Sequence, residues 1–343
     1  MKQSEERRLE LTLCGRAGID LNTEKTGCTF AEISSFSKSV GGSPANIVQG
    51  AARLGLKTAF LGKIARDGMG AYILEEFERR GIDTAGMVLD DTNARNCLAL
   101  TEIISPDASG SYVAKGGDFH HGTYLYREGT ADLLYGPDDV LEEIIANSQA
   151  VMVSGTAFSG QPSRDAMFKI LRLAQHHKTT AVFDLDYRPY GWSSTTEASK
   201  CLEQAVRQCD IIIGNREEFN VLEYRSMPDN RDNRKSAEAL LKAGTSLVII
   251  KNGEKGSEAY TSDGQHLCCK AIPTNRVKTF GSGDAYAAGL MYGLLKNMGL
   301  EYAMQLGTAC ASIALTKVSC ADSMPDFYTA EAHRKAHIQE MKV

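Results

Sequence analysis

The stretch Gly281-Ser282-Gly283-Asp284 combines residue types that could transfer a phosphoryl group to a hydroxyl. Two glycines around a serine, followed by a run to Lys296 without β-branched side chains, predict a tight turn that opens a helix. The first backbone N–H groups of a helix lack partners and carry about half a positive charge, so they attract anionic oxygen. Residues 281–283 would then stabilise the transferred charge, and Asp284 would accept the hydroxyl proton. The alternative is an ordinary helix start, in which Asp284 bonds only its own first turn.

A second turn of this kind, Gly41-Gly42-Ser43-Pro44-Ala45-Asn46, lies near the start of the chain. Ser43 can cap a helix, Pro44 suits the first helical turn, and apolar residues follow at helical spacing. Two glycines before the helix would let a small polar ligand reach the backbone at Gly42, with Asn46 one turn inside as donor and acceptor. Simple capping needs only one glycine, so we favour a ligand site.

Two carboxylates and a guanidinium follow a predicted strand in the run Asp184-Leu185-Asp186-Tyr187-Arg188. Arg188 could bind the phosphate or carboxylate of a ligand through two parallel hydrogen bonds. Alternatively, it forms a local ion pair with Asp184 or Asp186. The residue types therefore predict either an anion site or a structural ion pair at this strand end.

Two further strand ends carry residues suited to a nucleotide. Asn215 and Glu218 share one face of a first helical turn after the strand 210–214, where an acid would act through Mg²⁺ and its waters. The same Asn-x-x-Glu spacing is also a plain capping box. Lys251 and Gly253 follow the next strand and offer a cation and flexible backbone to a nucleotide, or form only a turn.

The order of the apolar runs predicts how these residues are positioned. The run at 11–15 predicts a first buried strand, which delivers Arg16 and Asp20 to the edge where ligands bind in open α/β sheets. Beyond residue 137, strands and helices alternate, which predicts parallel strands covered on both faces. The expected strands are 57–64, 150–154, 180–186, 210–214 and 246–251, and the expected helices are 45–54, 69–80, 163–177, 196–208 and 235–243. The fold class is therefore α/β, with a mostly parallel central sheet in a single domain over residues 1–343.

Two polar segments, about 20–40 and 95–127, show a different pattern. Short runs with Thr, Tyr and Val are interrupted by Ser-Pro-Asp and Gly-Gly-Asp, which is typical of β-hairpins. We expect the two segments to form a small sheet inserted as a lid. An apolar lid face would also suit a homodimer formed through the lid.

Composition narrows the class of protein. The 343 residues are 43% hydrophobic and 24% charged, as in soluble globular proteins. The net charge of −5 comes without a basic run, so we expect no nucleic-acid partner. No apolar run approaches the roughly 18 residues that a membrane span needs, so we expect no membrane partner either. Nine cysteines without metal-ligand spacing indicate reduced thiols in a cytoplasmic protein.

With the turn at 41–46, Asn215-x-x-Glu218 in the middle and the turn at 281–284, the chain resembles the ribokinase-like (PfkB) carbohydrate kinases. The three motifs occur in the family's order, and the resemblance covers about residues 10 to 330. It implies a ribokinase-like three-layer fold with helices on both faces of the sheet and a small β lid. It also implies ATP and Mg²⁺ as phosphoryl donor and a sugar hydroxyl as acceptor.

Carried over to the matching positions, the resemblance gives the residues of the two glycine turns their roles. Asp284 would be the base, and Gly281, Ser282 and Gly283 would form the anion hole. The hydroxyls of the sugar would bind to Asp20, Gly42 and Asn46.

The resemblance also assigns the nucleotide side of the site. Asn215, Lys251 and Gly253 would line the nucleotide, and Glu218 would hold metal-bound water. One position departs from the family pattern, because Lys278 stands where an aspartate that helps to bind a monovalent cation is common. We hypothesise that the Lys278 ammonium replaces this ion. Equal activity in potassium and in a large organic cation would support the hypothesis, and strong activation by potassium would refute it.

Other residues resemble those of family members that act on sugar acids. Arg127 follows Tyr126, similar to the Tyr-Arg pair of 2-keto-3-deoxygluconate kinases, in which the arginine serves an acidic sugar. A substrate carboxylate needs a cation to offset its desolvation, and Arg127 and Arg188 are the candidates. The resemblance thus implies a small sugar acid as substrate. The alternatives are a 2-keto-3-deoxygluconate kinase, a fructokinase, which acts on a neutral sugar, and a non-catalytic sugar-binding regulator.

Overall fold

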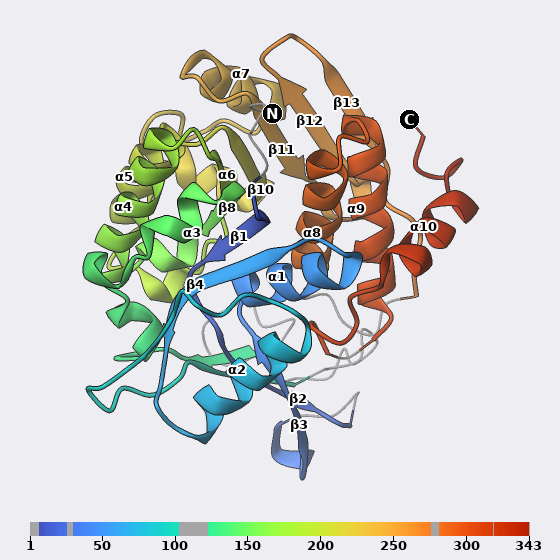
Figure 1. Cartoon of the computed structure of the whole chain (residues 1–343). Helices are drawn as coiled ribbons and strands as arrows, with labels where there is room; N and C mark the ends of the chain where they lie inside the picture. The colour runs from blue at the N-terminus through green and yellow to red at the C-terminus, as the bar shows by residue number, and fades with distance from the viewer. Residues whose placement is uncertain (1–6, 26–29, 103–122, 276–280, 318, 343) are drawn as a thin grey trace.

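The computed structural model describes residues 7–25, 30–102, 123–275, 281–317 and 319–342. These residues form a large sheet with helices on both faces and a second, smaller sheet at one end of it (Figure 1). Lys278 and the Ser-Pro-Asp and Gly-Gly-Asp runs of the expected lid lie outside the described residues.

The large sheet has the strand order β13-β12-β11-β10-β9-β8-β1-β4-β5. From β5 to β11 neighbouring strands are parallel, and β12 and β13 continue the sheet as an antiparallel hairpin. The strands are β1 Leu9–Cys14, β4 Thr58–Ile64, β5 Met87–Leu89, β8 Ser148–Ser154, β9 Thr180–Asp184, β10 Ile211–Asn215, β11 Leu247–Lys251, β12 Ser257–Thr261 and β13 His266–Cys269. This is the mostly parallel sheet that the alternation of strands and helices predicts.

Helices cover both faces of the sheet and create two separate cores. Ile211 and Ile213 of β10 pack into one core and Ile212 into the other, which explains why this strand is continuously apolar. The first core receives buried residues from α1 Ser43–Leu54, α2 Gly68–Arg79, α8 Ser282–Leu295, α9 Leu300–Leu315 and α10 Phe327–Ala336. The second receives them from α3 Glu142–Ala146, α4 Ser163–His176, α5 Thr195–Val206, α6 Arg216–Leu222 and α7 Asn233–Lys242.

Small residues bring α1, α8 and α9 into close contact. A Cβ added to Gly50 of α1 would lie 2.9 Å from the Cβ of Ala288 of α8. A Cβ on Gly289 would likewise lie 2.8 Å from the Cα of Gly307 on α9. Because a larger side chain at these positions would push the helices apart, the glycines set the spacing between α1 and α8.

The smaller sheet has the order β3-β2-β6-β7 and lies below the large sheet in Figure 1. Its strands are β2 Gly18–Thr23, β3 Phe36–Gly41, β6 Leu98–Thr101 and β7 Thr123–Tyr126. They come from the two segments in which the sequence indicates hairpins. Short 3₁₀ turns occur at Phe30–Glu32, Ala131–Leu134, Pro137–Asp139, Gly155–Phe158, Pro189–Gly191 and Gly253–Lys255.

The predicted helices and strands of the large sheet are present, with ends shifted by a few residues, as is usual for element boundaries. The elements β5, α3 and α10 were not predicted. β5 and α3 are too short to produce a periodic apolar signal.

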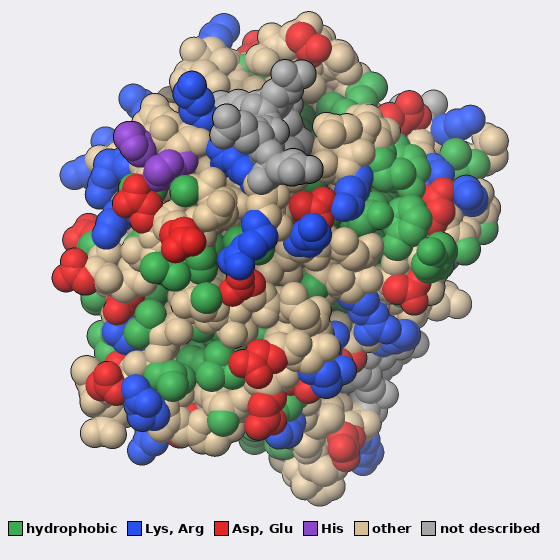
Figure 2. Space-filling model, in the orientation of Figure 1, with side chains coloured by type: hydrophobic (Ala, Val, Ile, Leu, Met, Phe, Trp, Pro, Cys, Tyr) green, Lys and Arg blue, Asp and Glu red, His purple; other side chains and the backbone are tan. Residues whose placement is uncertain are grey.

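On the face shown in Figure 2, acidic and basic side chains are interspersed. None of the helices among the described residues combines the length and the apolar character needed to span a membrane.

Candidate active site

The carboxyl ends of the parallel strands bring residues distant in sequence to one edge of the large sheet. Asp184 ends β9, Asn215 ends β10 and Lys251 ends β11, and these strands are neighbours. The helices α1 and α8 also begin at this edge, since Ser43 in the first turn of α1 contacts both Asp184 and, in the first turn of α8, Asp284. In open α/β sheets this edge is where ligands bind.

Asp284 lies in the first turn of α8, and its carboxylate is held by α1. Gly281 precedes the helix with a φ of 80°, a conformation that glycine adopts without strain, and no side chain caps this turn. Asp284 Oδ1 accepts a hydrogen bond of 2.8 Å from Ser43 Oγ, and Oδ2 accepts one of 2.8 Å from Asn46 Nδ2. The structure therefore does not show the ordinary helix start in which Asp284 bonds its own turn.

Compared with water, the environment of Asp284 favours the protonated form of its carboxyl group. Burial, followed by the negative charge of Asp186, raises the pKa of Asp284 to about 6. The hydrogen bond from Asn46 acts in the opposite direction, because it stabilises the carboxylate. A carboxyl with this pKa is ionised at neutral pH and is a stronger base than an exposed aspartate.

Ser43 was expected to cap α1, and this prediction is wrong. The residue before the helix is Gly42, with a φ of 104°, and Ser43 is the first helical residue. Its hydroxyl lies 3.2 Å from Asp184 Oδ2 as well as 2.8 Å from Asp284 Oδ1. Because a hydroxyl carries one proton, only one of the two carboxylates can receive it at a time.

Lys251 supplies the positive charge next to these carboxylates. Its ammonium lies 3.5 Å from Asp184 Oδ1, and both side chains are largely buried. Burial lowers the pKa of Lys251, but attraction to Asp184 and Glu218 outweighs this effect, so the pKa is raised overall. The ammonium would also lie 3.4 Å from a Cβ at Gly283, which places it beside the first turn of α8. A cation and a helix N-terminus therefore meet at one point.

A cavity of about 590 Å³ opens at this point, within the usual size of ligand pockets. Its polar lining includes Lys251, Gly253, Ser282 and Gly283. The lining also contains apolar side chains, among them Ile272, Pro273, Ala311 and Leu315, beside further polar ones. A cavity that offers both a cation and apolar surface fits a nucleotide, whose phosphates are anionic and whose base is flat and largely apolar.

Asn215 and Glu218 form the reciprocal capping box that their spacing predicts as an alternative. Glu218 Oε2 accepts from the backbone N–H of Asn215 at 2.7 Å, and Asn215 Oδ1 accepts from that of Glu218 at 2.9 Å. Burial raises the pKa of Glu218 to about 7, although Lys251 counteracts this shift. Glu218 Oε1 accepts no hydrogen bond from the described residues, so capping leaves one oxygen for a water or metal ligand. Asn215 does not line the 590 Å³ cavity.

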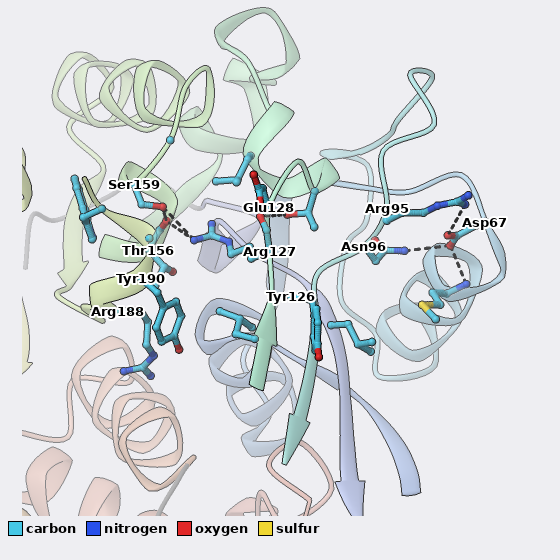
Figure 3. A pocket seen from close by; sticks show the side chains of 18 residues that line it. Asp67, Arg95, Asn96, Tyr126, Arg127, Glu128, Thr156, Ser159, Arg188 and Tyr190 are labelled. Carbon is cyan, nitrogen blue, oxygen red and sulfur yellow. Dashed lines mark hydrogen bonds and ion pairs between the residues drawn. The ribbon is translucent and has the colours of Figure 1, made fainter. Parts of the chain in front are cut away.

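A second cavity, of about 910 Å³, lies between the smaller sheet and the loops that follow β8 and β9 (Figure 3). Arg127 and Arg188 both line it, together with Asn96, Tyr126 and Tyr190. In Figure 3 Arg188 and Tyr190 lie on one side and Arg95 and Asp67 on the other.

The two arginines of this cavity differ in their exposure and in the number of partners that their guanidinium groups already have within the protein. Arg127 pairs with the buried Asp132 at 2.7 Å, donates 2.9 Å to Thr156 O, and is only 10% exposed. Arg188 is 45% exposed and pairs with Asp186 at 3.0 Å. The local ion pair predicted for Arg188 is thus formed, and it leaves part of the guanidinium open to a ligand.

Asp186 adopts a strained backbone conformation, with a φ of 28°. Its carboxylate accepts from Ser154 Oγ at 2.8 Å and from Thr156 Oγ1 at 3.1 Å. Burial alone would raise the pKa of Asp186, but Arg188 and Arg16 lower it overall. These contacts fix a negative charge and hold Arg188 at the edge of the cavity.

Asp20, Gly42 and Asn46 come together near the start of α1. A Cβ on Gly41 would lie 1.9 Å from Asp20 Oδ1, and one on Gly42 would lie 2.6 Å from Arg16 O. Asp20, Gly42 and Asn46 are not part of the lining of the 910 Å³ cavity. The sequence identified these positions and Asp284, but it considered Ser43 only as a helix cap and Asp184 only as a possible ion-pair partner of Arg188. The Asp-x-Asp run that begins at the last residue of β9 is the signal that could have assigned Asp184 to the site.

Comparison with known proteins identifies the family. A model of the pfkB family carbohydrate kinases matches residues 9–326. The chain belongs to this family. It is 40% identical over 334 residues to the 5-dehydro-2-deoxygluconokinase of Geobacillus kaustophilus, covering 97% of this chain and 96% of that protein. It is also 40% identical over 322 residues to the 5-dehydro-2-deoxygluconokinase of Bacillus subtilis, covering 94% of each chain.

Solved structures confirm the ribokinase-like fold. A fructokinase from Xylella fastidiosa with bound ATP superimposes with a TM-score of 0.81 at 19% identity, covering 96% of this chain and 99% of that one. A protein from E. coli solved in complex with ATP and Mg²⁺ gives a TM-score of 0.83 at 18% identity, covering 96% of this chain and 100% of that one. At these identities the likeness concerns the fold alone.

Proposed function

We propose that the protein transfers a phosphoryl group from ATP to the 6-hydroxyl of 5-dehydro-2-deoxy-D-gluconate, a step of myo-inositol catabolism. The observation that carries this function is the near full-length identity of 40% to kinases of that name. The half-buried carboxylate at the start of α8, beside a cavity lined by Lys251, supports the same reaction class.

ATP would occupy the 590 Å³ cavity. Its phosphates would face Lys251 and the turn formed by Gly281, Ser282 and Gly283, while Gly253 would border the nucleotide. We assign Asn215 a supporting role through its capping bonds, because its side chain already binds the Glu218 backbone.

Glu218 is the residue that would hold Mg²⁺, through water. Its capping bond uses Oε2 alone, and burial gives the carboxyl a pKa of about 7. A nearby cation would keep this carboxyl ionised. Bound MgATP would supply the phosphoryl group and neutralise part of its charge.

Asp284 would act as the base that accepts the proton of the sugar hydroxyl. Ser43 and Asn46 fix its carboxylate, so the base is oriented before the substrate arrives. The first backbone N–H groups of α8 and the Lys251 ammonium would stabilise the charge that spreads over the transferred group. Asp20, Gly42 and Asn46 would position the sugar by its hydroxyls.

The substrate carboxylate would bind Arg188. This guanidinium is 45% exposed in the 910 Å³ cavity, whereas the Arg127 side chain is engaged by Asp132 and two neighbouring oxygens. Arg127 would therefore shape the cavity, and its contact with substrate would be secondary. A carboxylate placed in this cavity gains charge-assisted hydrogen bonds that a neutral sugar cannot form.

The whole chain would act as one kinase domain, with β2, β3, β6 and β7 as a lid over the sugar. Phe30, Tyr124 and Tyr126 expose 43%, 40% and 63% of their surface at this sheet, which supports a homodimer formed through the lid. Sedimentation of the wild type and a Tyr126→Lys variant would test this arrangement.

A cytoplasmic location is supported by the absence of disulfides among the eight cysteines that the structure describes.

Coupled measurement of ADP release against a panel of sugars tests the function. We expect the highest kcat/KM with 5-dehydro-2-deoxygluconate, a lower value with 2-keto-3-deoxygluconate and little activity with fructose. Preference for a neutral sugar would overturn the proposed substrate. Sugar binding without ADP release from any panel member would indicate a regulator instead of an enzyme.

A further inference from the structure

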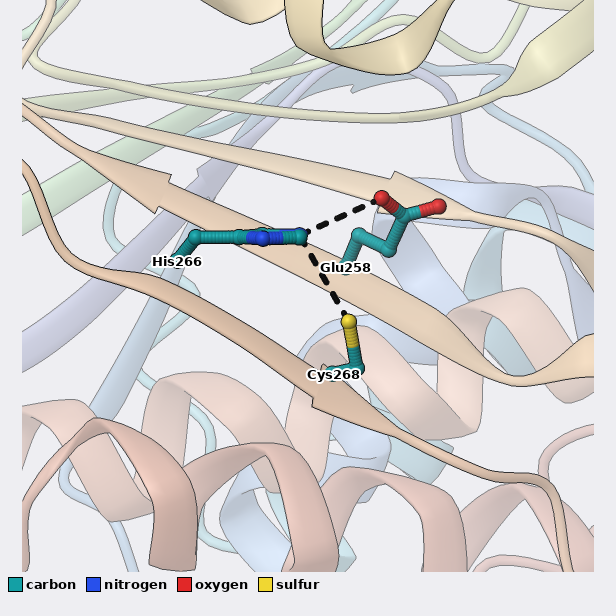
Figure 4. Close-up of side chains that lie close together, drawn as sticks. All are labelled: Glu258, His266 and Cys268. Atoms are coloured by element: carbon teal, nitrogen blue, oxygen red, sulfur yellow. Dashed lines mark hydrogen bonds and ion pairs between the residues drawn. The ribbon is translucent and has the colours of Figure 1, made fainter. Parts of the chain in front are cut away.

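The β12–β13 hairpin gathers three metal-ligating side chains on one face, none of which lines the 590 Å³ cavity (Figure 4). Glu258 of β12 is paired directly opposite Cys268 of β13 in the antiparallel register. His266 lies two residues before Cys268, and residues two apart on a strand point to the same side. The backbone itself therefore brings a carboxylate, an imidazole and a thiol together.

The two separations from His266 Nε2 to the other ligand atoms match those of a tetrahedral zinc site. His266 Nε2 lies 3.3 Å from Glu258 Oε2 and 3.5 Å from Cys268 Sγ. All three ligand atoms lie within 4.8 Å of one another. Zinc bonds of about 2.0–2.2 Å to nitrogen and oxygen and about 2.3 Å to sulfur require N–O and N–S separations of about 3.4 and 3.6 Å at a tetrahedral angle.

Groups outside the cluster orient two of the three side chains. Glu258 Oε1 accepts from Asn233 Nδ2 at 2.7 Å and from Asn252 Nδ2 at 2.9 Å, which turns Oε2 toward His266. The ring of Tyr260 stacks on that of His266 with centroids 4.4 Å apart and planes 10° apart. Such outer contacts are what fix the ligands of a metal site before the ion binds.

We propose that Glu258, His266 and Cys268 form a binding site for a divalent transition metal, with Zn²⁺ as the preferred ion and water as fourth ligand. Mixed thiolate, imidazole and carboxylate donors select Zn²⁺ over Mg²⁺ and Ca²⁺, which prefer oxygen. Because the thiolate is the ligand, binding releases the thiol proton to solvent. The cysteines show no metal-ligand spacing along the chain, because Glu258 joins the cluster only through strand pairing.

A hydrogen bond from Arg234 opposes metal binding at this site, so substitution of Arg234 tests the proposal. Arg234 Nη2 donates to His266 Nδ1 at 3.3 Å, so that Nε2 carries the ring proton in the metal-free state. A metal at Nε2 requires the other tautomer, in which Nδ1 carries the proton and Arg234 must move away. Removal of Arg234 is therefore expected to tighten metal binding, an effect that a merely structural cluster would not show.

Co²⁺ titration of the full-length protein, freed of metal and nucleotide, tests the proposal, because cobalt bound to a thiolate absorbs through a charge-transfer band. We expect one equivalent of Co²⁺ to produce the band and one equivalent of Zn²⁺ to displace it. Cys268→Ser is expected to abolish the band, His266→Ala and Glu258→Ala to weaken binding by about 10–100-fold, and Arg234→Ala to strengthen it several-fold.

The matched control is His177→Ala, which removes an exposed His–Glu pair of 2.7 Å with Glu142 that has no cysteine beside it. It should leave the Co²⁺ titration unchanged. Absence of the band in the wild type, its survival in Cys268→Ser, or an unchanged Co²⁺ affinity in His266→Ala would overturn the proposal. Circular dichroism confirms that each variant is folded, and none of these readouts depends on the kinase reaction.

Discussion

Asn46 Nδ2 donates a hydrogen bond of 2.8 Å to Asp284 Oδ2 across a sequence separation of 238 residues. The proposed base is therefore held by a side chain from the other end of the chain, in the helix that begins the proposed sugar site. This contact depends on the close packing of α1 against α8. It also makes the ionisation of Asp284 sensitive to a residue that does not itself exchange protons.

The first prediction concerns the pH dependence of activity. Since the base must be ionised, kcat/KM is expected to rise with pH through about 6, the pKa of Asp284. Asn46→Ala removes a hydrogen bond to the carboxylate, so the rise should move upward by roughly one pH unit. A pH profile of both proteins measures this shift. Asn147→Ala, which loses only a bond to the Glu143 backbone, is the control, and an unshifted profile in Asn46→Ala would contradict the coupling.

The second prediction concerns catalysis by Asp284. Replacement by Ala removes the proton acceptor but leaves the cavity for ATP intact, so turnover should fall by roughly 10²–10⁴-fold with little change in ADP affinity. Steady-state kinetics and calorimetry measure the two quantities. Asp91→Ala, which removes an exposed carboxylate paired with Arg66, should change neither. Nearly full turnover in Asp284→Ala would exclude this residue as the base.

The third prediction follows from the same pKa and concerns stability. A carboxyl whose pKa rises from 3.8 to about 6 on folding binds extra protons in the folded state, so its stabilising contribution is lost as pH rises between these values. Asp284→Asn removes the ionisation. Compared with the wild type, the variant should gain up to about 3 kcal/mol in free energy of unfolding between pH 4 and pH 7. Urea denaturation at several pH values measures it, and a constant difference would argue against the raised pKa.

Most elements of the fold could be predicted because they depend on local sequence. The continuous apolar run Ile211-Ile212-Ile213 predicts a strand buried on both faces, and the glycine turn at 281–284 predicts a helix start. The contact between Asn46 and Asp284 could not be predicted, because it follows from the spacing of two helices that Gly50 sets through tertiary packing. Partners close in sequence, such as Asn215 and Glu218, were thus visible in the sequence, while the distant partner of Asp284 was not.

Ser43 illustrates the same limit. Its type and place before a helix indicate a cap, which is a local property. In the structure Gly42 takes that position with a positive φ, and the Ser43 hydroxyl instead contacts two carboxylates from distant segments. Because residue 42 adopts a positive φ, which suits glycine, Gly42 takes the cap position and the Ser43 hydroxyl is left to contact the two carboxylates. Only the folded structure shows this.

The fourth prediction concerns Lys251. Lys251→Met removes the cation beside Asp184 and the first turn of α8, so the affinity for ADP should fall by about 10–100-fold. The loss also leaves Asp184 and Glu218 without their nearest positive charge, which should raise the pKa of both. Isothermal calorimetry measures the affinity. Lys242→Met, on the exposed end of α7, is the matched control, and unchanged ADP binding in Lys251→Met would separate this residue from the nucleotide.

The fifth prediction separates the two arginines of the 910 Å³ cavity. Arg188→Met removes a partly exposed guanidinium, so KM for the sugar acid should rise by roughly 10–100-fold with little change in kcat. The loss of stability should be smaller than that of Arg127→Met, because Asp186 keeps Arg16, Ser154 and Thr156 as partners. Arg127→Met instead leaves the buried Asp132 without its cation, which should lower the free energy of unfolding by about 3–5 kcal/mol. Kinetics with 5-dehydro-2-deoxygluconate and urea denaturation measure the two effects. The reverse pattern, with KM sensitive to Arg127 and not to Arg188, would assign the substrate carboxylate to Arg127.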